Sequence, residues 1–295
     1  MSRQSLMLAI PLVIVLGVFV GLVTAQAIRA DDSNPNASAA TTTTTLRPVS
    51  TSTIPTTFLK PVAATPEANT LNSGLRLPDW QCELQPLNDM SAESQRTFVE
   101  SGLQCLERIW LPALRDANIV GTVPPVKLVL VENDQPACNN HKTASPTEVA
   151  FYCANTVYWP VADESRKDLG AKDWDLYLFL LMHEYGHHVQ ELTGLSRVAD
   201  HRQQDAGVDS PTGLLLSRRV ELQAQCLAGM AMAAAEQGGA LSARKVGHII
   251  DDESNMVEEE VHGSSASNYR WTQAGYRDRA TTACNTWTAA PDEVN

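Results

Sequence analysis

The residues whose types and spacing could do chemistry are His183, Glu184 and His187, which form an H-E-x-x-H motif. On a helix, side chains four positions apart lie about 40° apart around the axis, so both imidazoles leave the same face one turn apart. This spacing can offer two nitrogen ligands to one tetrahedral Zn²⁺, and the adjacent glutamate can take a proton from a water molecule at the metal. The motif therefore predicts a zinc site with Glu184 as a catalytic base.

A match this short also arises by chance in chains that bind no metal. The surrounding sequence favours a buried helix, because residues 174–182 are largely apolar and contain neither proline nor glycine. Asp173 is a suitable N-cap, and Gly194 lies where a C′ glycine ends a helix. Buried histidine and glutamate side chains need polar partners, and a metal ion supplies one.

A third ligand is needed, because a catalytic zinc site usually takes three protein ligands and leaves one position open. The extended pattern H-E-x-x-H-x-x-G-x-x-H is excluded, since Gln190 and Thr193 stand where it requires glycine and histidine. A glutamate from a following helix is the other common solution, and Glu221 lies in such a segment. The residues alone leave a second interpretation open, in which Glu221 is a surface residue paired with Arg218.

Periodicity in the rest of the chain predicts an α+β fold. Apolar spacing indicates further helices at residues 91–118, 214–237, 242–257 and 266–287. Strands are expected at residues 126–131, 148–153 and 156–159, the last two joined by a short turn. The polar stretch 196–213 is expected to be irregular. Strands followed by helices suggest a small sheet beside the buried zinc-binding helix and a mostly helical C-terminal part.

The N-terminus carries an export signal. Residues 5–28 are uncharged and follow Arg3, and about 20 helical residues span the thickness of a bilayer core. We expect residues 1–30 to be an uncleaved transmembrane anchor that leaves the rest of the chain extracytoplasmic; a cleaved signal peptide and a secreted protein are the alternative. Residues 31–74, rich in Thr, Ser, Pro and Ala, predict a disordered linker, and residues 75–295 the folded domain.

The cysteine content and the net charge narrow the possible classes of protein further. The six cysteines contain no C-x-x-C pair, which argues against a cysteine zinc site. In an exported protein they predict three disulfides, although free thiols and several pairings stay open. Sequential pairing would join Cys82 to Cys105, Cys138 to Cys153 and Cys226 to Cys284. The net charge of −12 argues against a nucleic-acid partner.

Several separate segments resemble the bacterial family of putative neutral zinc metallopeptidases. They are residues 183–190 (HEYGHHVQ), 221–224 (ELQA), 226–229 (CLAG), 151–153 (FYC) and 262–265 (HGSS). The resemblance covers roughly residues 76–287, with the segments in order. It implies a zincin-like fold that binds Zn²⁺ through His183, His187 and Glu221, with Glu184 as the base, and a peptide or protein substrate.

The same resemblance points to His262, Gln225 and Asn268. His262 could donate a hydrogen bond to the developing oxyanion, or could be an ordinary loop histidine. The family pattern has aspartate where this chain has Gln225, and an arginine near Asn268. Loss of a carboxylate behind a ligand histidine typically costs roughly 10–100-fold in metal affinity or activity. The alternative function is therefore a catalytically silent, membrane-tethered binding domain on the same scaffold.

If the chain is a peptidase, an extended substrate can add to the edge of the small sheet. We expect that edge near Tyr158. The oligomeric state is left open by the sequence.

Overall fold

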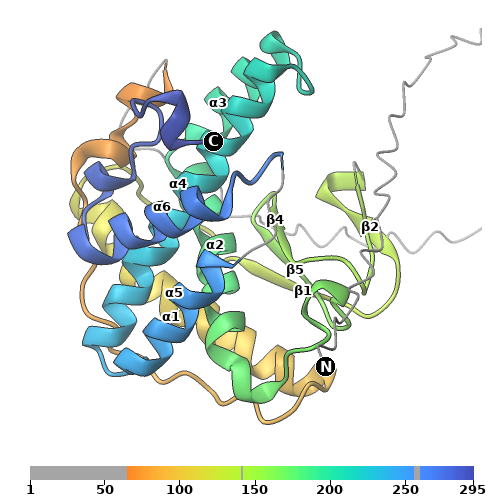
Figure 1. Cartoon of the computed structure of the whole chain (residues 1–295). Coiled ribbons are helices and arrows are strands. Elements are labelled where there is room, and N and C mark those ends of the chain that lie inside the picture. The colour runs from red at the N-terminus through yellow and green to blue at the C-terminus, as the bar shows by residue number, and fades with distance from the viewer. Residues whose placement is uncertain (1–64, 141, 256–259) are drawn as a thin grey trace, which may run out of the picture. The chain divides into compact units, whose positions relative to one another are not determined.

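The computed structural model describes residues 65–140, 142–255 and 260–295, all within one compact unit (Figure 1). The anchor expected at residues 1–30 lies outside the described residues, as does the expected linker up to residue 64. The α-helices described are α1 (Ala92–Asp116), α2 (Trp174–Leu192), α3 (Leu195–Ala206), α4 (Pro211–Gln237), α5 (Ala243–Ser254) and α6 (Ser265–Asp278). The strands are β1 (Lys127–Val131), β2 (Gln135–Ala137), β3 (Lys142–Ala144), β4 (Phe151–Cys153) and β5 (Thr156–Pro160). In this part of the chain, no helix combines the length and hydropathy that crossing a bilayer requires.

The main sheet has the strand order β1-β5-β4, with β1 parallel and β4 antiparallel to the central β5. Strands β4 and β5 form the expected hairpin. Its turn residues Ala154 and Asn155 have φ of 49° and 60°, the left-handed pair typical of a type I′ turn. Strands β2 and β3 form a separate antiparallel pair. The predicted α+β fold is confirmed.

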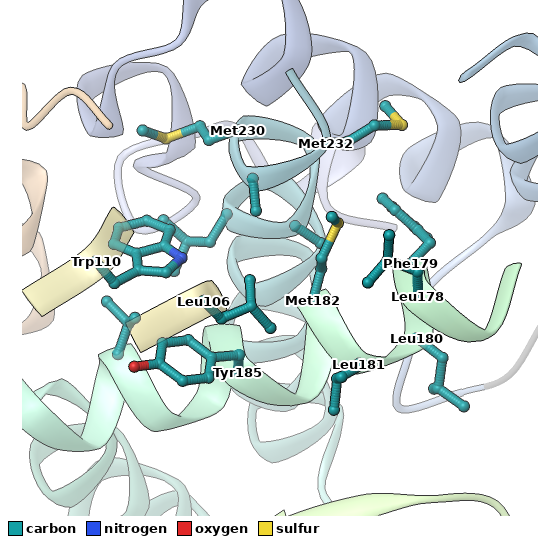
Figure 2. Packing of buried hydrophobic residues seen from close by; sticks show 14 of the residues in the cluster. Leu106, Trp110, Leu178, Phe179, Leu180, Leu181, Met182, Tyr185, Met230 and Met232 are labelled. Carbon is teal, nitrogen blue, oxygen red and sulfur yellow. The ribbon is translucent and has the colours of Figure 1, made fainter. Parts of the chain in front are cut away.

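Helix α2 is the element on which the others pack. Its residues Leu178 and Leu181 are fully buried, and α1 contributes the equally buried Leu106 and Trp110. Figure 2 shows these side chains as parts of one buried cluster, which also includes Met230 of α4. The strands lie on one side of α2, and α4, α5 and α6 on the other (Figure 1). A helix that is apolar nearly all round is stable only when it is enclosed in this way.

Two expectations about the helices were wrong. Residues 195–206 form α3, although an irregular stretch was expected there. This helix buries only Leu195 and Ala199, so it carries too little apolar periodicity for a pattern to reveal it. The last helix ends at Asp278, where Arg279 adopts a left-handed conformation with φ of 55°, and a short 3-10 helix, Thr281–Cys284, follows.

Three disulfides join the cysteines in the sequential pairing, which is confirmed: Cys82–Cys105, Cys138–Cys153 and Cys226–Cys284. The last pair ties α4 to the 3-10 helix after α6. Disulfides of this kind are typical of extracytoplasmic proteins. Upstream of the first pair, residues 66–73 form two short 3-10 helices, and Leu71 is buried in the main core.

Candidate metal centre

Helices α2 and α4 bring His183, His187 and Glu221 together. One potential ligand atom from each residue lies within 4.8 Å of the other two. Glu221 Oε2 lies 3.3 Å from His183 Nε2 and 3.2 Å from His187 Nε2. The two Nε2 atoms are themselves 3.2 Å apart. The structure therefore groups all three residues that the sequence analysis named as metal ligands.

Close contact between the two helices makes this grouping possible. Gly186 lies between the two histidines and faces α4, and a Cβ atom at this position would meet the carbonyl oxygen of Ala224 at 2.9 Å. A side chain larger than hydrogen would therefore push α4 away. Because Glu221 lies one turn before Ala224, its carboxylate reaches the two imidazoles only while the helices stay this close.

The carboxylate of Glu221 is suited to a cation. Its Oε2 atom is buried and makes no hydrogen bond of good geometry within the described residues. Burial raises the pKa of Glu221, but the imidazoles of His187 and His183 outweigh burial and hold it well below its usual value. The alternative ion pair with Arg218 is not formed, because that guanidinium donates to the backbone carbonyls of Val294 and Glu260.

The carboxylates of Glu221 and Glu184 favour a positive charge at this position. Burial lowers the pKa of His187, but the carboxylates of Glu221 and Glu184 raise it to about 9. Two imidazole nitrogens and one carboxylate oxygen are a common donor set of catalytic zinc. Donor chemistry, spacing and the unsatisfied oxygen of Glu221 all fit Zn²⁺.

Each histidine is held from behind by a glutamine. His183 Nδ1 donates to Gln225 Oε1 at 2.8 Å, and His187 Nδ1 donates to Gln190 Oε1 at 3.0 Å. When such a ring is neutral, its proton lies on Nδ1 and the lone pair of Nε2 is directed toward Glu221. An aspartate at position 225 is therefore not needed for an acceptor to reach His183.

The carboxylate of Glu184 lies beside the two histidines and is only 5% exposed. Burial raises its pKa, the imidazoles of His183 and His187 oppose that rise, and the backbone N–H of Tyr152 donates to it. Glu184 and the three potential ligands line a cleft of about 350 Å³, together with residues 150–154. A buried carboxylate at a cleft wall can hold or release a proton according to its surroundings.

The sheet edge beside the cleft belongs to β4. Tyr158 lies on β5, which pairs on both sides, so the edge expected near Tyr158 is instead formed by Phe151–Cys153. The Tyr152 hydroxyl donates to Glu191 Oε2 at 2.8 Å and lies 2.9 Å from His188 Nδ1. These contacts fix β4 against α2 and leave its outer edge along the cleft.

His262 lies at the exposed side of the same cleft. Its Nε2 atom is 3.7 Å from Glu221 Oε2, and 45% of its side chain is exposed. Asn268 is buried, and its Nδ2 donates to the carbonyls of His262 and Ser264, each at 3.1 Å. The residue that replaces the expected arginine thus holds the turn that carries His262.

Sequence reasoning did not assign Gln190 or Glu253 to the site. Gln190 lies three residues after His187 on a helix, and this spacing could have indicated a partner. Glu253 lies on α5 and reaches the site only through Gln225, so no local pattern points to it. His188 is buried, burial lowers its pKa to about 3, and its Nδ1 lies against the Tyr152 hydroxyl, so it contributes to the packing of β4 on α2.

Fold and site together define an α+β protein in which two imidazoles and a carboxylate offer a donor set for zinc. The sequence profile of a family described as "Putative neutral zinc metallopeptidase" matches residues 78–287. The match covers more than half of the chain, so the protein belongs to this family, whose cofactor is Zn²⁺.

Two curated relatives share 30% identity with this chain over 155 residues. Both are named "Uncharacterized protein YpfJ", from Escherichia coli strain K12 and from strain O6:H1. The alignment covers 46% of this chain and 53% of each relative, so the chain spans about half the length of the curated relatives it matches. No solved structure matches the chain.

Proposed function

We propose that this protein is a zinc-dependent metallopeptidase that hydrolyses peptide bonds. In this proposal His183, His187 and Glu221 bind the metal and Glu184 is the general base. The observation that carries it is the convergence of three ligand atoms within 4.8 Å beside a buried carboxylate in a cleft. Membership of the metallopeptidase family supports the same reaction class.

In this proposal each residue of the site has its own role in the reaction. Bound zinc would polarise the scissile carbonyl and lower the pKa of a water molecule there toward ~7. Glu184 takes a proton from the attacking water as the new carbon–oxygen bond forms. It then delivers that proton to the leaving nitrogen as the carbon–nitrogen bond breaks, so the peptide is replaced by an acid and an amine. His262 donates a hydrogen bond to the carbonyl oxygen as negative charge develops there.

An extended peptide is the substrate form that the cleft favours. Residues 150–154 line it, and β4 lies at the edge of the sheet. A peptide added along this edge would place one of its carbonyl groups between Glu184 and His262. We therefore propose that main-chain pairing with β4 aligns the substrate.

The test is cleavage of a mixed peptide library by the full-length, zinc-loaded protein, with Glu184→Ala as the matched variant. Cleavage by the natural protein is expected, and the loss of the base is expected to reduce turnover by ~10²–10⁴-fold. Zinc content, measured in both proteins, is expected to stay near one per chain because Glu184 is not a ligand in this proposal. Full activity in the variant would refute the assignment. Zinc in both proteins with cleavage by neither would favour the silent binding domain.

We further propose that residues 1–30 anchor the catalytic domain to the membrane and leave it extracytoplasmic. The uncharged stretch at residues 5–28 and the three disulfides support export. The measurement is N-terminal sequencing of the mature protein after alkaline extraction of membranes. An intact N-terminus in the membrane fraction is expected, and a shortened chain in the soluble fraction would favour secretion.

A further inference from the structure

Gln225 of α4 forms hydrogen bonds through both the oxygen and the nitrogen of its side-chain amide. It is 4% exposed and lies directly behind His183. Its Oε1 accepts the proton of His183 Nδ1 at 2.8 Å, whereas its Nε2 donates to Glu253 of α5 and, at 3.1 Å, to Thr272 Oγ1 of α6. The amide thus connects the ligand histidine to a carboxyl group on another helix.

The orientation of this amide decides which nitrogen of His183 can bind metal. The two ends of a glutamine amide have nearly the same shape, but one end only accepts and the other only donates. With the amide reversed, His183 Nδ1 would have to accept a hydrogen bond. A neutral ring would then carry its proton on Nε2, the atom that faces Glu221, and could not bind a metal there. A carboxylate behind the ring would have no such problem, because both of its oxygens accept.

Among the described groups that contact the Gln225 amide nitrogen, Glu253 in its carboxylate form is the one that selects the productive orientation. The hydroxyl of Thr272 can donate or accept, so it tolerates either end of the amide. As a carboxylate, Glu253 can only accept, so it requires the Nε2 end of the amide; the protonated acid also carries an O–H that can donate to a reversed amide. Glu253 is only 6% exposed, so bulk water does not compete for the amide.

We propose that Glu253 is a positioning residue of the metal centre. By accepting from Gln225 Nε2, it keeps Gln225 Oε1 on His183 Nδ1 and leaves the lone pair of His183 Nε2 free for the metal. This inference rests on the proposed zinc site. It also gives a reason why glutamine can stand at position 225 in this chain: a carboxyl group behind it holds the amide in place.

The first test is Glu253→Leu in the full-length protein, with zinc affinity measured by competition with a chromogenic chelator. We expect affinity to fall by at least ~10-fold, as is typical when support behind a ligand histidine is lost. The matched control is Glu236→Leu, which removes a partly buried carboxylate of α4 that accepts from the Tyr276 hydroxyl at 2.5 Å. The control should keep its zinc affinity even if its Tm falls.

A rescue variant separates orientation from packing. In Q225E/E253Q the carboxylate faces His183 and the amide behind it donates to that carboxylate, so the hydrogen bonds are kept with the groups exchanged. We expect zinc affinity to return close to that of the natural protein. Nitrogen-15 spectra of the metal-free proteins should show the Nδ1–H form of His183 in the natural protein and the rescue variant, and its loss in Glu253→Leu.

The outcomes separate the two levels of the proposal. Unchanged zinc affinity in Glu253→Leu would overturn the positioning role and leave the proposed peptidase intact. A rescue variant as weak as Glu253→Leu would also overturn it, because packing alone would then explain the loss. A natural protein that binds no zinc would overturn the proposed function, and this inference with it.

Discussion

The two histidines of the motif are supported in different ways. His187 is backed by Gln190, whose Nε2 donates to the carbonyl of Val220 at 2.9 Å and to Gln223 Oε1 at 3.1 Å. His183 is backed by Gln225, whose amide meets Glu253. A backbone carbonyl can only accept, so it holds Gln190 in one orientation under all conditions.

A carboxyl group, in contrast, titrates and depends on the packing of its own helix. Gln190 and its backbone acceptor belong to α2 and α4, the helices that carry the proposed ligands. Glu253 belongs to α5, which carries none of the proposed ligands. We therefore expect the His187 side of the site to be robust and the His183 side to be adjustable.

The largest expected effect comes from removing a ring itself. His187→Ala and His183→Ala should each abolish stoichiometric zinc binding and turnover, because two remaining donors hold zinc weakly. Metal content after dialysis, measured by atomic absorption, is the check. His201→Ala, which changes an exposed histidine outside the cleft, should retain full zinc content. One bound zinc per chain in either ligand variant would show that the histidine it lacks is not a ligand.

The next effect concerns the His187 side of the site, which is expected to be the robust one. Gln190→Leu leaves the Nδ1–H of His187 without its buried acceptor, at a cost of about 1–3 kcal/mol. The carbonyl of Val220 and Gln223 Oε1 also lose one donor each, although Trp287 Nε1 still donates to Gln223 Oε1. Both the free energy of unfolding and zinc affinity should therefore fall. Glu253→Leu, in comparison, should weaken zinc binding with a smaller loss of stability in the metal-free protein. Denaturant titrations of both variants without zinc measure the difference, and equal losses would erase the contrast between the two supports.

The third effect is a dependence on pH that Glu253 gives to the His183 side. Burial, and then repulsion from Asp252, raises the pKa of Glu253 from 4.5 to about 8, with Arg166 opposing the rise. Gln225 and Thr272, which face it from α4 and α6, do not titrate in this range. The native protein thus holds a proton that the unfolded chain releases, and the stability this provides is full below about pH 4.5 and lost as the pH rises to about 8.

Denaturant titrations of the metal-free protein at several pH values test this sign. The free energy of unfolding of the natural protein should fall relative to that of Glu253→Gln as the pH rises through this window. Parallel curves for the natural protein and Glu253→Gln would contradict the raised pKa.

The smallest effect is expected on the substrate side of the cleft. Asn268→Ala removes the hydrogen bonds that hold the turn carrying His262. It changes neither Gln190 nor Gln225, the glutamines that support the histidines. Turnover should fall by roughly 10-fold, a fraction of what an oxyanion donor contributes, while zinc affinity stays unchanged. Steady-state kinetics and chelator competition measured on one preparation give both quantities. A fall in zinc affinity would instead tie His262 to the metal.

The elements with strong local signals were predictable from the sequence. The α2 helix follows from its apolar run and from Gly194, whose φ of 71° matches the left-handed C′ position. The hairpin of β4 and β5 follows from two short apolar runs around Ala154-Asn155. Helix α3 and the pair β2–β3 were missed, because few of their residues are buried and a polar helix carries no periodic signal.

The sequence by itself determined the pairing of His183 with His187 and the place of Glu184 beside them, because residues four apart on one helix must share a face. It also indicated the class of chemistry, since the motif offers two potential zinc donors and an adjacent carboxylate that can act as a base. Tertiary structure alone decided the rest. Glu221, Gln225 and Glu253 come from helices α4 and α5, and they meet α2 only because Gly186 lets two helices approach closely and α5 packs behind them. Such contacts depend on packing between distant segments, which no local spacing encodes.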